Sequence, residues 1–174
     1  MMFDPTIYEN LKVVMEGAIY DLDLTNEIKV RNRSDILNLA VMSRCFSMQF
    51  QSYKAKDSYP LAEIALHTSM KDLALEILEE NETEAGCEIA VYFYTRIKNI
   101  EKDCSHIEFF LNNIWNQRPA IKQEISYYYS NKNTVYNKVT LTFGRKINED
   151  QIDDFHNIID HTLQSLYYFE TELS

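Results

Sequence analysis

An amphipathic helix near the C-terminus is the most constraining pattern in this sequence. Apolar residues recur there at spacings of three and four, which is the period of one helical face, at Ile152, Phe155, Ile159, Leu163 and Leu166. Asn148 and Gln151 have the spacing of a capping pair, so the helix is predicted to start there and to run to about Phe169. A helix that is apolar on one face belongs to a layered fold, in which another element covers that face.

Strands are predicted where apolar and polar residues alternate, because successive side chains of a strand point to opposite faces. One such strand covers residues 46–51, and a second runs from Cys87 to Ile97. Residues 121–145 predict a hairpin that turns at 130–133, where the sequence Ser-Asn-Lys-Asn is typical of a turn.

Residues 5–24 fit both a strand and a helix. Alternation over 11–32 predicts a further hairpin with Gly17 at a bulge. The alternative is a helix that starts near Asp4-Pro5 and gathers its apolar residues on one face, namely Ile7, Leu11, Met15, Ala18 and Leu22. We prefer the hairpin, because glycine inside a helix costs roughly 1 kcal/mol relative to alanine.

Three more helices are predicted from capping residues and prolines. Ser34 caps a short helix over 34–43, since its hydroxyl can accept a first-turn N–H. Pro60 opens a helical stretch, as one helix or two, to about Glu80. Ser105 and Glu108 form a capping box for a helix that Pro119 ends.

Together these elements predict an α+β fold. The sheet is expected to be mostly antiparallel, built from two hairpins plus single strands, with helices interspersed and a long C-terminal amphipathic helix. The length suits one substantial core and no Pro- or Gly-rich linker divides the chain, so residues 1–174 are predicted to form a single domain.

The net charge of −10 is placed unevenly along the chain. Residues 149–174 hold seven acidic residues and neither Lys nor Arg. Such a charge argues against nucleic-acid binding, which draws most of its sequence-independent affinity from Lys and Arg. It favours a basic protein partner, although a run of charge is more often simply a solvated surface.

The amino-acid composition excludes several further classes of function. With only three glycines, neither a P-loop nor a G-x-G-x-x-G turn can be assembled. The three cysteines form no C-x-x-C pair, which predicts reduced thiols in a cytoplasmic protein. The sequence shows neither the pattern of a signal peptide nor an apolar run long enough to span a membrane, and we expect no cofactor.

Two sets of residues are candidate sites. Alternation predicts that Tyr92, Tyr94, Tyr128 and Tyr136 share one face of the sheet, where tyrosines suit a ligand cleft or an interface between subunits. On the terminal helix Asp153, His156 and Asp160 form a polar stripe that has the side chains for a divalent metal or a general base. A solvated flank is the simpler interpretation of that stripe, and we expect no metal there.

The sequence names no reaction and leaves two hypotheses. The first is a small acidic cytosolic module without catalytic activity that binds a basic protein, or a second copy of itself, through the tyrosine-bearing face or the acidic helix. The second is a small-molecule binder or enzyme with an aromatic pocket between sheet and helices. That pocket would be lined by Tyr127, Tyr129, Trp115 and Phe143 and would use Asp153, His156 or His106 for its chemistry.

Overall fold

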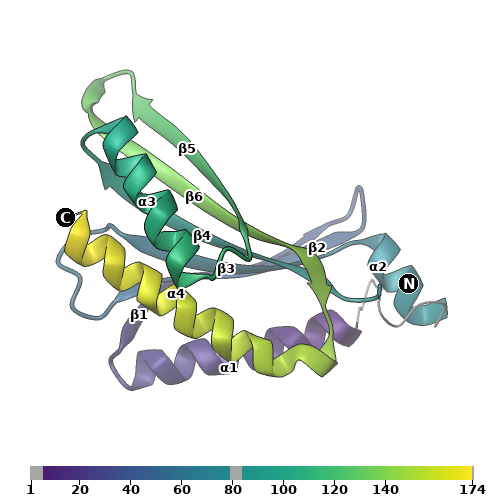
Figure 1. The fold of residues 1–174 in the computed structure, drawn as a ribbon. Coiled ribbons are helices and arrows are strands. Elements are labelled where there is room, and N and C mark those ends of the chain that lie inside the picture. The colour runs from purple at the N-terminus through teal and green to yellow at the C-terminus, as the bar shows by residue number, and fades with distance from the viewer. Residues whose placement is uncertain (1–5, 79–83, 174) are drawn as a thin grey trace.

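The computed structural model describes residues 6–78 and 84–173 and shows the predicted α+β fold (Figure 1). Its helices are α1 (Thr6–Leu24), α2 (Met70–Leu78), α3 (Ile100–Ile114), the short 3-10 helix η1 (Glu149–Gln151) and α4 (Ile152–Glu172). Its strands are β1 (Ile28–Asn38), β2 (Ser43–Ser52), β3 (Leu61–Thr68), β4 (Cys87–Ile97), β5 (Ala120–Tyr128) and β6 (Asn131–Ile147).

All six strands join one antiparallel sheet in the order β1-β2-β3-β4-β6-β5. The first four strands are neighbours in both sequence and space, and β6 then returns beside β4 with β5 outside it. The β5–β6 hairpin confirms the one predicted over 121–145. Its turn lies slightly earlier than expected, because Tyr128 already pairs with Asn131.

Helices α1, α3 and α4 pack on the same face of this sheet (Figure 1). The predicted apolar stripe of α4 is buried, and the Phe169 ring lies 5.1 Å from that of Phe93 on β4. The capping pair of Asn148 and Gln151 is also confirmed, since each side chain bonds the backbone N–H of the other. The core therefore lies between the helical layer and one face of the sheet.

The hairpin predicted over 11–32 is wrong, because this region holds helix α1 and only the start of β1. Tyr8, Leu11, Met15 and Ile19 are fully buried on one face of α1. Burying a large apolar side chain contributes roughly 1.5–3 kcal/mol, which outweighs the helix cost of Gly17. Gly17 itself is exposed on the opposite side of the helix.

Two other predicted helices are also corrected. Residues 34–38 belong to β1, and 61–68 form β3, which lies inside the sheet between β2 and β4. The helical stretch predicted from Pro60 is helical only over α2, and its predicted end at residues 79–80 lies outside the described residues. The helix predicted from Ser105 begins earlier, at Ile100, where Asn99 accepts a hydrogen bond from the backbone N–H of Lys102.

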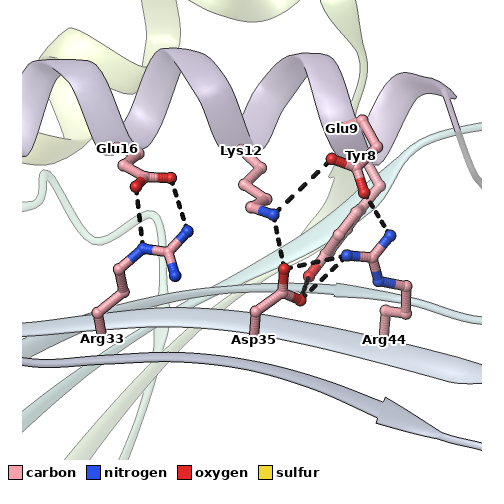
Figure 2. A network of polar contacts seen from close by, with 7 residues as sticks. All are labelled: Tyr8, Glu9, Lys12, Glu16, Arg33, Asp35 and Arg44. Carbon is pink, nitrogen blue, oxygen red and sulfur yellow. Dashed lines mark hydrogen bonds and ion pairs between the residues drawn. The ribbon is translucent and has the colours of Figure 1, made fainter.

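Charged side chains join α1 to the first two strands (Figure 2). Asp35 on β1 accepts hydrogen bonds from Lys12 at 2.6 Å, from the Tyr8 hydroxyl at 3.1 Å and from Arg44 on β2 at 3.0 Å. Glu9 pairs with Arg44 as well. These contacts hold α1 over the edge of the sheet that the strand β1 forms.

Burial acts to raise the pKa of Asp35, but the Lys12, Tyr8 and Arg44 contacts outweigh it and hold the pKa below its usual value. Burial and the negative charge of Asp35 both raise the pKa of Tyr8. The carboxylate is therefore charged and the phenol neutral near pH 7. Every charge in this network faces an opposite charge, which is the pattern of a structural clamp.

Across the described ranges, no helix is both long enough and apolar enough to span a bilayer.

Candidate binding surface

The face of the sheet opposite α1, α3 and α4, here called the open face, carries the second set of alternating side chains from each strand. On the central strands these side chains are half-buried, including Gln49, Glu63, Tyr92, Tyr94, Lys138 and Thr140. Among the described residues, only α2 borders this face, at the end of the sheet where β3 stops and β4 starts. A broad surface of polar and aromatic groups is thus accessible.

The structure places the four predicted tyrosines close together on this face. Tyr94 pairs with Lys138 across β4 and β6, and Tyr92 lies two residues before Tyr94 on the same strand. Tyr136 lies two residues before Lys138, and the ring of Tyr128 meets the Tyr136 ring edge-on at 5.6 Å. The binding role of these tyrosines stays a prediction.

Three residues that the sequence did not single out complete the cluster. Tyr59, from the loop before β3, lies 5.7 Å from the Tyr136 ring, and Arg96 lies over the Tyr59 ring at 5.2 Å. Lys138 lies 4.8 Å from the ring centre of Tyr92 and 5.8 Å from that of Tyr94. We call these residues the tyrosine–cation surface, made of Tyr59, Tyr92, Tyr94, Arg96, Tyr128, Tyr136 and Lys138.

The hydroxyl groups of the central tyrosines remain neutral. Burial and the charge of Glu63 raise the pKa of Tyr94, whose hydroxyl donates to a Glu63 oxygen at 2.9 Å. Burial, followed by the negative charges of neighbouring groups, raises the pKa of Tyr92. Glu63 also accepts from the side-chain amide of Gln49 at 2.7 Å. Tyr92 and Tyr94 therefore present O–H groups, rather than phenolates, at neutral pH.

A row of small side chains crosses the open face beside this surface. Strand pairing aligns one residue from each of the six strands, namely Ser34, Ser47, Ala65, Ala90, Thr142 and Ala120. Part of this row floors a cavity of about 970 Å³, with Tyr92 on one side and Lys71 and Leu75 of α2 on the other. The tyrosine–cation surface and this depression share Tyr92 and form one continuous region.

No protein-family model, curated protein or solved structure matches the chain. Its function must be inferred from this geometry.

The polar stripe of α4 lies on the opposite layer of the molecule. Asp153, His156 and Asp160 are all exposed to solvent. Within the described part of the chain, no three His, Cys, Asp or Glu side chains are grouped in a way that could hold a metal ion. The neighbouring Asp154 forms an ion pair with Arg145 on β6 at 3.0 Å.

The alternative pocket residues are not brought together. Trp115 and Phe143 pack at 5.5 Å and line a separate cavity of about 490 Å³ with His161. Tyr127 and Tyr129, in contrast, are 57% and 91% exposed at the tip of the β5–β6 hairpin. His106 is hydrogen-bonded to the Tyr168 hydroxyl at 3.0 Å, beyond the reach of His156, which is exposed on α4.

The sequence contained part of the signal for the missed residues. Lys138 follows Tyr136 by two positions and therefore shares its face, as Arg96 shares the face of Tyr94. Tyr59 had no such signal, because it lies in a loop whose position depends on the pairing of β2 with β3.

Proposed function

We propose that this protein is a small cytoplasmic module without catalytic activity, whose function is to bind another protein through the open face of its sheet. The observation that supports this is the tyrosine–cation surface, where five tyrosines and two cations lie side by side on an accessible sheet face. Tyrosine and arginine are enriched among the residues that dominate protein–protein binding energy, because they combine a large contact area with polar tips.

The depression beside the tyrosines supports the same proposal. A flat sheet face offers little shape, whereas a row of small residues next to projecting tyrosines gives a partner a concave site to fill. Across six strands spaced about 4.8 Å apart, the row is roughly 24 Å long. A length of this order accommodates a segment of several residues.

A small-molecule site is the second candidate, because the cavity of about 970 Å³ lies at the upper end of the range for ligand pockets. The residues that line this cavity, however, are less typical of a small-molecule site. Ligand pockets are mostly apolar with a few placed polar groups, whereas charged side chains are prominent here, namely Lys71, Glu84, Glu88, Arg145 and Lys146.

Affinity capture with matched variants tests the proposal. The full chain and its variant Thr142→Arg, which fills the depression from an exposed position, would be used as baits in a cell lysate and compared by quantitative mass spectrometry. Asp160→Arg, on the exposed side of α4, is the control. Circular dichroism would establish that all baits are folded.

We expect at least one protein to be captured equally by the wild type and Asp160→Arg, and to be reduced at least tenfold with Thr142→Arg. Capture that is the same for all three baits would refute open-face binding. Loss with Asp160→Arg alone would refute it too, and would transfer the binding site to the acidic helix.

A further inference from the structure

Charge is segregated between the two layers of the fold. Helices α1, α3 and α4 with η1, which form the helical layer, contain fourteen acidic and two basic residues, whereas the strands contain four acidic and ten basic residues. The net charge of −10 therefore describes the helical layer, and the sheet has the opposite sign.

Three of these ten strand bases, Arg96, Lys132 and Lys138, lie with tyrosines at one end of the sheet. Three segments meet there, the β2–β3 loop (53–60), the end of β4 with the residue that follows (94–98), and the hairpin 126–138. They share a cavity of about 430 Å³, lined in part by Tyr59, Arg96 and Asn133. Together the segments hold seven of the twelve tyrosines, and their charged residues are six basic and one acidic, namely Lys54, Lys56, Asp57, Arg96, Lys98, Lys132 and Lys138. Arg96 is ion-paired with Asp57, and two acids of adjoining strands lie beside this end, Glu63 next to Tyr94 and Glu124 opposite Lys138. The bases therefore still outnumber the acids here, by six to three.

Cations lie against several of the aromatic rings at this end. Lys138 covers the rings of Tyr92 and Tyr94, Arg96 covers Tyr59, and Lys132 lies 5.2 Å over Tyr129. Single-stranded nucleic acid binds such surfaces by stacking bases on open ring faces. Ammonium, guanidinium and phenol groups instead supply hydrogen-bond donors, which match the oxygens of carboxylates.

We propose that this tyrosine-rich end of the sheet binds an acidic segment of a partner protein. The inference rests on the proposed function and specifies the partner's charge, which is opposite to the one that the net charge of the chain suggests. Glu170 and Glu172 of α4 lie toward the same end on the helical side, so an acidic segment is directed onto the open face. At 0.1 M salt the Debye length of about 10 Å limits repulsion from the rest of the helical layer.

Binding of labelled probes to the full chain tests the charge of the partner. The probes are short poly-L-glutamate, poly-L-lysine and a fifteen-nucleotide oligo-dT, measured by fluorescence anisotropy at 0.1 M salt. We expect poly-L-glutamate to bind, with an affinity that falls as salt rises. The double variant Lys132→Gln/Lys138→Gln should weaken binding at least tenfold, and the control Arg118→Gln, an exposed base in the loop before β5 beside the cavity that Trp115 lines, less than twofold.

Three outcomes would overturn the inference: no binding of poly-L-glutamate, an equal loss with Arg118→Gln, or tighter binding of oligo-dT. Light scattering of the protein alone would detect a second copy as the occupant, and self-association abolished by Lys132→Gln/Lys138→Gln would likewise overturn it. Cross-linking of the captured partner through Lys138 separates the two proposals. A basic cross-linked segment refutes the acidic partner but leaves open-face binding intact, whereas capture unaffected by Thr142→Arg refutes both.

Discussion

Removal of the Asp35 carboxylate is expected to destabilise the protein strongly, because three donors converge on it. The side chains of Asp35, Lys12 and Arg44 are only 20%, 15% and 14% exposed, and Tyr8 is fully buried. In Asp35→Ala the Tyr8 hydroxyl loses its acceptor, and both cations keep Glu9 as their remaining charged neighbour.

The magnitude follows from these contacts. A buried hydroxyl without an acceptor costs about 1–3 kcal/mol, and breaking a fully buried ion pair costs about 3–5 kcal/mol. Glu9 still pairs with Lys12 and Arg44, and some solvent reaches both cations, so the second cost is only partly incurred. We expect Asp35→Ala to lower the free energy of unfolding by about 2–4 kcal/mol.

Urea unfolding followed by the fluorescence of Trp115, the single tryptophan and only 4% exposed, measures this change. Asp160→Ala, a matched removal of an exposed acid, should change stability by less than about 0.5 kcal/mol. A loss of that small size in Asp35→Ala would refute the view of this network as a clamp.

The same carboxylate predicts a pH dependence. Since the pKa of Asp35 lies below its usual 3.8 in the folded state, its stabilisation is complete above that value and is lost as the pH falls through the folded pKa. The stability difference between the wild type and Asp35→Asn should therefore be largest near pH 6 and shrink below about pH 4. A difference that stays constant from pH 6 to pH 2.5 would contradict this reasoning.

Four further substitutions or treatments have defined outcomes. Gly17→Ala should raise the free energy of unfolding by about 0.5–1 kcal/mol, because the position is exposed on α1 with open space around it; a decrease in the urea midpoint would count against it. Gly86→Ala should lower stability by about 1–3 kcal/mol, since a Cβ there would lie 2.6 Å from the Ile147 carbonyl oxygen, and an unchanged melting temperature would contradict this contact. Asn148→Ala should lower the free energy of unfolding in urea by about 1 kcal/mol, because the helix loses its cap; an unchanged free energy would contradict this role of Asn148. Burial raises the pKa of Cys87 to about 12, so iodoacetamide at pH 8 should leave it unmodified until the protein is denatured; rapid labelling of the native protein, detected by mass spectrometry, would be inconsistent with that burial.

The sequence by itself determined the elements whose signals are long and local. The terminal helix has a sustained three-and-four repeat plus a capping pair, and both are present in α4 and η1. Alternation over β4 and over the β5–β6 hairpin predicted these strands, and it also predicted that Tyr92, Tyr94 and Tyr136 point to one side. Such features depend only on neighbours a few residues away, so one sequence suffices to detect them.

Tertiary packing determined the secondary structure of those segments whose sequence pattern fits both a helix and a strand. Residues 6–24 became a helix because four large side chains find a buried site against the sheet, and 61–68 became a strand because β2 and β4 flank it on both sides. Local propensity is worth a few tenths to about 1 kcal/mol per residue, which is less than the burial of a single large apolar side chain.

Tertiary structure also determined which residues make up the candidate surface. Register places Arg96 opposite Tyr136 and Tyr94 opposite Lys138, brings Tyr59 against them, and aligns six small residues into a depression. The sign of its charge likewise differs from that of the whole chain, because the bases are dispersed along the sequence and meet only when the strands pair. Composition counts charges, but only the folded sheet determines which of them share a surface.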